Sequence, residues 1–307
     1  MQLNLNNKTL GIIFILLLVI VLFLFFFESG KDERTFRSEL VSIDTSSVSQ
    51  IIIHTKTGKN PVRIFKEGKD WNVELFNGNT AHVTDQKINK MLKELIAIKP
   101  KRLAARGEEK WNAYQVDSTG TRVQVYEGDD KTLDIIIGRF NYQQQPRSIS
   151  TYVRLNNDTD VYEVDGFLSV TFNQNPDAYR DGTIIKGDSN TWTQLQFQYP
   201  ADSSFTLLKN NNRWFIDGVE TDSIKTANYL RTISNFTRNY FADTVEVKKT
   251  VPDYKLSITN SKLEFIQIDG YANPNGITIV SSLNPDTKFD GKTFVKNLFV
   301  GKSNFFK

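Results

Sequence analysis

The sequence of 307 residues contains no cysteine. This absence excludes disulfide bonds, thiolate catalysis, cysteine-ligated metals and a lipidated N-terminal cysteine. Histidine is also scarce, because it occurs only at His54 and His82, and neither belongs to an H-x-x-x-H or H-E-x-x-H spacing. We therefore expect no metal site built on these side chains and no bound cofactor.

The chain also lacks a surplus of either charge. Its 38 basic and 35 acidic residues are mixed along the sequence and leave a formal net charge of +3. No basic face for nucleic acid is visible, so nucleic acid is not an expected partner.

Catalytic motifs are missing as well. Neither phosphate-binding glycine loop, G-x-x-x-x-G-K-[ST] or G-x-G-x-x-G, is present, and no G-x-S-x-G elbow presents a serine nucleophile. We therefore expect a protein that is not an enzyme, with no catalytic residue to name. A hydrolase that uses scattered carboxylates stays open as a weaker alternative, because two acids suffice for glycoside cleavage.

One long hydrophobic run is present. Residues 10–27 contain no charged or hydrogen-bonding side chain, and as a helix they would span about 27 Å. This predicts a transmembrane anchor that uses membrane lipid as a partner. A cleaved signal peptide is the weaker interpretation, because no small-x-small pair follows the run, and a buried core helix is weaker still at an extreme terminus.

The expected orientation of that anchor rests on layout, because the flanking charges oppose it. Lys8 precedes the run and Lys31, Arg34 and Arg37 follow it, yet long domains cross a membrane largely regardless of such charges. We predict a single-pass protein of the bacterial cytoplasmic membrane, with the N-terminus inside and the large domain on the periplasmic side.

The rest of the chain shows one order of elements twice, about 140 residues apart. Each copy opens with two strand-like segments and a third that carries a tryptophan, Trp71 or Trp214. A Thr-Asp pair then predicts a helix start, and a paired-strand signature follows the helix. In the first copy the expected elements are strands 48–54, 62–66 and 70–73, a helix start at 84–85 and a hairpin at 122–137. In the second copy they are strands 192–197, 205–209 and 213–216, a helix start at 221–222 and a hairpin at 255–268.

These patterns predict an α+β fold class, with one N-terminal transmembrane helix followed by two tandem repeated modules. Each module is expected to be a mostly antiparallel sheet covered by a helix. The expected divisions are a cytoplasmic tail at 1–9, the transmembrane anchor at 10–27, a linker at 28–39, the first module at 40–185 and the second module at 186–307.

The combined pattern resembles a bacterial membrane-anchored family of unknown function, the DUF4340-like proteins. Members of that family occur beside, or fused to, components of gliding-motility-type ABC transporters. The resemblance covers almost the whole chain after the anchor and implies an envelope accessory subunit, with no catalytic residues to carry over. The matching residues are Trp71, Thr84, Asp85, Tyr152, Val153, Arg154, Val161, Tyr162, Glu163, Val164, Arg180, Asp181 and Trp214.

The connection between the two expected modules is the candidate contact site. Arg180 lies between Asp177 and Asp181, and its planar fork of donors would suit a partner carboxylate. A salt bridge that holds the modules together is the stronger interpretation. Trp71 and Trp214 would suit sugar stacking, but equivalent positions in a repeat favour a role in the core.

Two classes of function remain. The first is a non-catalytic, membrane-anchored accessory or binding subunit that works on the periplasmic side with an ABC transporter permease and its associated subunits. The alternative is an envelope module that binds glycan, lipid or peptide in a cleft between the two modules.

Overall fold

The computed structural model describes residues 14–19, 37–247 and 249–307. Within the hydrophobic run, the described residues 14–19 are helical. No helix among the described residues is long and apolar enough to cross a membrane. The expected fold class, which began with a transmembrane helix, is therefore corrected. The expected tail at 1–9, the rest of 10–27 and most of the linker at 28–39 lie outside the described residues.

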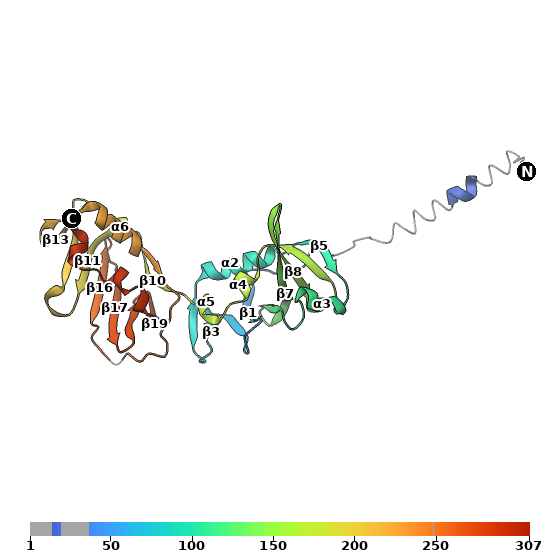
Figure 1. Cartoon of the computed structure of the whole chain (residues 1–307), viewed down its shortest axis with the longest axis horizontal. Coiled ribbons are helices and arrows are strands. Elements are labelled where there is room, and N and C mark those ends of the chain that lie inside the picture. The colour runs from blue at the N-terminus through green and yellow to red at the C-terminus, as the bar shows by residue number, and fades with distance from the viewer. Residues whose placement is uncertain (1–13, 20–36, 248) are drawn as a thin grey trace, which may run out of the picture.

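The described chain is mostly antiparallel sheet. The first sheet has nine strands in the order β4-β3-β2-β1-β6-β7-β8-β9-β5. Figure 1 shows β1, β3, β5, β7 and β8 of this sheet together in one body of the molecule. These strands are β1 (Val48–His54), β2 (Val62–Glu67), β3 (Asp70–Glu74), β4 (Thr80–Val83), β5 (Pro100–Ala105), β6 (Thr121–Glu127), β7 (Asp130–Gln144), β8 (Arg147–Leu155) and β9 (Val161–Asp165).

Alternation along the strands builds the core of this sheet. Ile51 of β1 lies opposite Ile64 of β2 on one side and Val125 of β6 on the other, and all three are buried. Helix α2 (Asp85–Ile96) presents buried residues at three- and four-residue spacing to this core. The buried residues of α2 are Ile88, Met91, Leu92 and Leu95.

The opposite face of β7, β8 and β9 has a small core of its own. Val116, Ile136, Tyr152 and Val161 pack there, covered by the segment that includes α3 (Trp111–Tyr114). This second covering explains why β8 reads as a run of buried residues from Ser150 onward rather than as an alternation.

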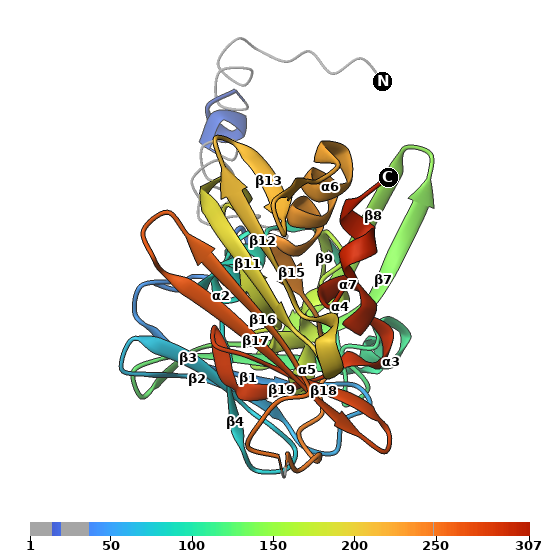
Figure 2. The same ribbon diagram turned by 90° about the vertical axis from the view of Figure 1, so that its left-hand side faces the viewer.

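The second sheet has eight strands in the order β14-β13-β12-β11-β16-β17-β18-β19. These strands are β11 (Trp192–Gln198), β12 (Phe205–Asn210), β13 (Arg213–Ile216), β14 (Val219–Glu220), β16 (Tyr254–Asn260), β17 (Phe265–Asn273), β18 (Gly276–Ser281) and β19 (Asn284–Asp290). Helix α6 (Ser223–Ile233) and the short α7 (Val295–Leu298) pack against it, with aromatic residues such as Phe197 and Phe305 in the core. Figure 2 shows α6 beside β13.

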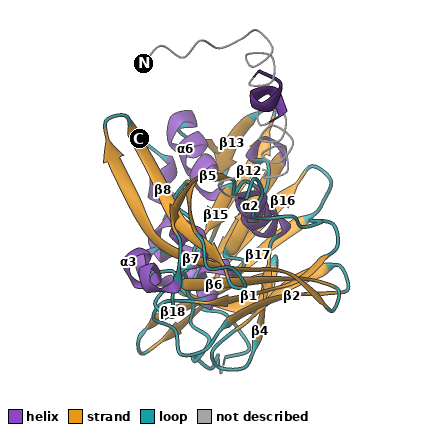
Figure 3. Cartoon of the chain, turned by 90° about the vertical axis from the view of Figure 1, so that its right-hand side faces the viewer, coloured by secondary structure: helices purple, strands orange, loops and turns teal. Residues whose placement is uncertain are grey.

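The two sheets repeat the same strand order, with one difference at an edge. In the first copy, the strand after the helix, β5, pairs with β9. In the second copy, the corresponding β15 (Asn235–Thr237) pairs with β10 (Thr183–Lys186) in a separate two-stranded sheet. The chain between the copies carries α4 (Ser169–Phe172) and α5 (Pro176–Tyr179). Figure 3 shows the sheets with the helices against them.

Candidate functional site

The joint between the two sheets is built around Arg180, whose side chain is 2% exposed. Its Nη1 and Nη2 donate to the two carboxylate oxygens of Asp243 at 2.5 Å and 2.9 Å, and Nη1 also lies 3.2 Å from Asp177. The guanidinium carbon lies 3.8 Å from the ring centre of Phe241. A buried cation is thus held by a two-pronged carboxylate contact and an aromatic face.

The main chain of the same segment connects to both copies of the repeat. The backbone amide of Asp181 donates to the backbone carbonyl of His82 in β4 at 2.6 Å. The backbone carbonyl of Asp181 accepts a hydrogen bond from the side-chain amide of Asn284 in β19 at 2.8 Å. Lys87 of α2 donates to the carbonyl oxygens of Ala178 and Arg180. Burial lowers the pKa of Lys87, an effect that the nearby Asp181 carboxylate partly opposes.

The three residues singled out by the sequence therefore have different positions. Arg180 and Asp181 are parts of the joint, whereas Asp177 contacts Arg180 and is half exposed to solvent. Asp177 also lines a hollow of about 260 Å³ at the joint, together with Phe76, Pro176 and Phe241. Because Asp243 occupies the fork of Arg180, an incoming carboxylate would have to displace it.

A second buried arginine organises the first module. Arg154 donates to the carbonyl oxygens of Val116, Leu155, Asn156 and Asp158 at 3.0 to 3.2 Å. The ring of Trp111 lies 3.6 Å from its guanidinium carbon. Burial is the largest influence on the pKa of Arg154 and lowers it.

This role of Arg154 explains part of the family pattern at 152–154 and 161–164. One guanidinium satisfies carbonyl groups of the turn that connects β8 with β9 and of the loop before β6. In the sequence, Arg154 stands out only as part of the family pattern, and nothing there connects it with the ring of Trp111. A four-residue helix far from the hairpin gives no spacing signal that would connect the two residues.

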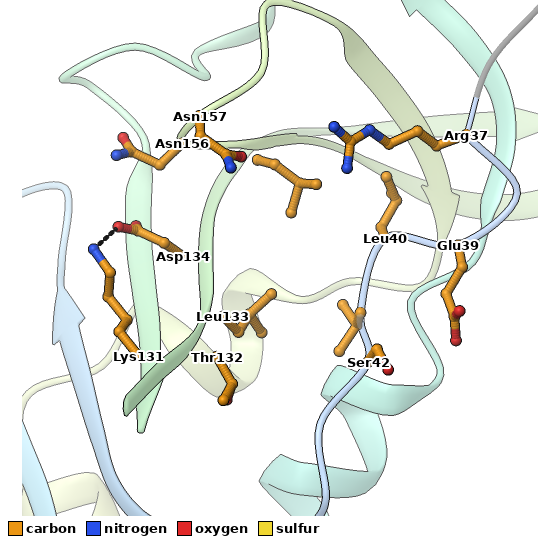
Figure 4. A pocket seen from close by; sticks show the side chains of 12 residues that line it. Arg37, Glu39, Leu40, Ser42, Lys131, Thr132, Leu133, Asp134, Asn156 and Asn157 are labelled. Atoms are coloured by element: carbon orange, nitrogen blue, oxygen red, sulfur yellow. Dashed lines mark hydrogen bonds and ion pairs between the residues drawn. The ribbon is translucent and has the colours of Figure 1, made fainter. Parts of the chain in front are cut away.

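A polar hollow of about 450 Å³ lies beside residues 37–42, the segment that precedes β1 (Figure 4). Arg37, Glu39 and Leu40 line one side of it, and Lys131 and Asp134 line another. Three of the charged groups that line it are paired: Arg37 lies 3.1 Å from Asp158, and Lys131 lies 2.7 Å from Asp134. The hollow therefore resembles a structural cluster more than a catalytic one.

Asp134 is the most strongly held carboxylate in that cluster. Arg122 donates two hydrogen bonds to it at 2.7 Å, and Lys131 and Gln124 donate one each. Burial tends to raise the pKa of Asp134, but these hydrogen bonds outweigh it and lower the pKa to about 2.

The two histidines lie apart from each other and from these clusters. His54 ends β1, and His82 lies in β4, with both side chains exposed. Within the part of the chain that the structure describes, no three acidic or histidine side chains are grouped so as to hold a metal ion.

The long hairpin of β7 and β8 and the segment that follows β9 share an exposed apolar surface, which we call the hairpin patch and define as Phe140, Tyr142, Ile149, Phe167 and Val170. Tyr142 lies directly opposite Ile149 across the hairpin, and Phe140 lies two residues away on the same face. The rings of Phe140 and Phe167 are 4.6 Å apart. A hollow of about 440 Å³ adjoins the patch, lined by Phe167, Val170 and residues of α2. Figure 2 shows the hairpin projecting from the sheet.

The geometry defines a two-copy, mostly antiparallel sheet protein with a buried arginine joint and an exposed apolar hairpin. The chain belongs to the DUF4340 family, a domain of unknown function whose profile matches residues 74–257. That range begins in β3 of the first copy and ends in β16 of the second, so the joint around Arg180 lies inside it. Neither a curated protein nor a solved structure matches the chain.

Proposed function

We propose that this protein is a non-catalytic accessory subunit of an ABC-type transport or export system, working on the extracytoplasmic side of the bacterial cytoplasmic membrane. The transport context comes from the family resemblance, since members occur beside transporter components. The hairpin patch is the observation that carries the docking role. Its partner in this proposal is the permease or another subunit of the transporter.

The patch has the features of a protein-docking surface. Phe140 and Tyr142 are 50% and 54% exposed, so two large rings present about half of their surface to solvent even though Phe140 also packs against Phe167. Contiguous exposed apolar groups with aromatic anchors are typical of binding surfaces, and burying them would supply the hydrophobic part of the affinity. The pairing of β7 with β8 holds the backbone of Phe140 and Tyr142 in place before any partner binds. Docking through these rings would therefore cost little conformational entropy.

The joint is a weaker candidate for binding a ligand. Its hollow of about 260 Å³ is smaller than the one beside the hairpin patch, and Asp243 already occupies the guanidinium of Arg180. The geometry therefore favours docking through the hairpin over a ligand cleft between the modules.

The test is copurification of the tagged protein from its native membrane fraction in mild detergents. The wild type should retain an ABC ATPase and a permease, and the combined variant Phe140→Ser, Tyr142→Ser and Ile149→Ser should lose them at least tenfold. The matched control is Val251→Ser, Leu263→Ser and Phe265→Ser, which removes three apolar side chains that are more exposed and lie elsewhere.

Thermal unfolding of both variants separates docking from folding, because substitutions at exposed positions change stability little. A wild-type protein that retains no transporter subunit in several detergents would contradict the proposal. Equal retention by the hairpin variant would remove the hairpin patch from it.

A further inference from the structure

A hollow of about 760 Å³ in the second module lies between β13 and α6. Trp214 of β13 lines it and is only half-buried, while Ala227, Leu230 and Arg231 of α6 line the facing side. A volume of this size accommodates a ligand of one or two sugar rings. Figure 2 shows α6 beside β13.

The repeat provides an internal comparison for Trp214. Trp71 occupies the same register position in the first copy, since Trp71 pairs with Lys66 and Trp214 pairs with Lys209. Trp71 is 6% exposed and belongs to the core. Both tryptophans were expected to be core residues. Trp71 is fully in the core, whereas Trp214 packs against the second core and is only partly buried.

The neighbouring edge strand explains the difference. In the first copy, β4 has four residues and ends directly opposite the tryptophan, where the buried Val83 pairs with Trp71. In the second copy, β14 has two residues and its pairs reach only Phe215 and Ile216. The position opposite Trp214 is taken by Thr221, whose amide and hydroxyl donate to the Trp214 carbonyl. With a shorter edge strand and a smaller polar residue opposite it, Trp214 packs against the second core but is less completely buried than Trp71.

The rim of the hollow is cationic. Lys209, Arg213 and Arg231 line it, against the single carboxylate of Glu220, which lies 3.3 Å from Arg213. The Lys209 ammonium lies 5.8 Å from the Trp214 ring centre and donates to the Asn190 carbonyl. Arg231 donates to Asn228 and forms no ion pair with a side chain among the described residues. Two positive charges thus remain without a carboxylate partner at the mouth of an aromatic hollow.

We propose that this hollow binds an acidic saccharide, a sugar ring that carries a carboxylate. The C–H groups of a sugar face carry slight positive charge and match the electron-rich face of an indole. Ser189, Asn212 and Ser223 offer hydrogen-bonding groups at the rim for hydroxyls. The guanidinium of Arg231 offers paired donors for the carboxylate. This inference does not depend on the transporter-docking role.

A pair of matched probes tests the proposal on the full chain. The two probes share one sugar ring. N-acetylmuramic acid has a lactyl substituent that carries a carboxylate, whereas N-acetylglucosamine lacks this substituent and is neutral. We expect calorimetric titration to give a dissociation constant at least tenfold lower for the acidic sugar, with quenching of indole fluorescence. Trp214→Ala should weaken binding of the acidic sugar at least tenfold. Arg231→Gln should remove the preference for it while leaving weak binding of both sugars.

The control substitution is Lys93→Gln. Lys93 has the same place in α2 that Arg231 has in α6, counting from the N-caps Thr84 and Asp222, and it lies in the other module. It should leave binding unchanged. Because Arg231 is exposed, its substitution should leave the fold intact even if Trp214→Ala does not. Absence of binding by both sugars at millimolar concentration, or equal affinity for the two, would overturn the proposal.

Discussion

At the scale of single residues, Asp134 makes acid stability a measurable property of the fold. The pKa of Asp134 is about 2 in the folded protein, against an ordinary value of 3.8. Between these two pH values the folded state therefore binds fewer protons than the unfolded state. The contribution of this carboxylate is fully present above about pH 4 and is lost as the pH falls toward 2. We expect Asp134→Asn to reduce the free energy of unfolding by about 1–2 kcal/mol at pH 7, allowing for the partial exposure of its partners.

The measurement is urea unfolding of wild type and variant at pH 7 and at pH 2.5. The difference in stability should shrink at the lower pH, because the wild-type carboxylate is then partly protonated. A difference that stays constant between the two pH values would show that hydrogen bonding to the neutral group, not charge, holds Arg122 and Lys131 in place.

Residue patterns identified part of the joint and missed the rest. The charged run around Arg180 is visible in the sequence, because three charged groups lie within five positions. Its partner Asp243 is 63 residues further along the chain, and the covering ring belongs to Phe241. The path of the chain after α6 and β15 brings Phe241 and Asp243 to Arg180. Local periodicity does not encode such a long-range path.

At the scale of elements, the two repeat helices differ in how they begin. Asp222 caps α6 by accepting hydrogen bonds from the amides of Ile224 and Lys225 at 2.9 Å and 3.0 Å. Thr84 has the N-cap position of α2 but its side chain makes no capping hydrogen bond. We expect Asp222→Ala to cost about 1 kcal/mol of stability and Thr84→Ala to cost less than about 0.5 kcal/mol.

Chemical denaturation of the two single variants checks this difference under identical conditions. The Thr84 variant is the control, because it removes a hydroxyl from the equivalent position. Equal losses in the two variants would mean that capping does not account for the difference between the helix starts.

Strand prediction succeeded where alternation is strong and failed at edges and long hairpins. The strand expected at 48–54 is β1 with the same bounds, because it alternates around Ile51 and Ile53. The hairpin of β7 and β8 extends to Gln144 and Arg147, beyond the expected strands, since its tip is polar and glutamine-rich. Strand β19 was not predicted at all, because its sequence NPDTKFD contains a proline and no clear alternation.

At the scale of the whole molecule, the buried ion pair between Arg180 and Asp243 connects the two sheets. Breaking a buried pair from one side leaves the remaining charge uncompensated, which costs roughly 3–5 kcal/mol. Arg180→Met should therefore destabilise the protein strongly. Calorimetry of this variant should resolve two unfolding transitions, one for each core, because each sheet has its own buried cluster on either side of residue 180.

A double-mutant cycle on Arg180→Met and Asp243→Asn gives the strength of the connection. We expect a coupling energy above about 1 kcal/mol, since the pair is buried and two-pronged. The same cycle on Arg213→Met and Glu220→Gln is the control, because both of those side chains are at least half exposed and should couple by less than about 1 kcal/mol. Similar coupling energies in the two cycles, or one transition retained in Arg180→Met, would mean that the modules are held together by the main-chain contacts of Asp181 instead.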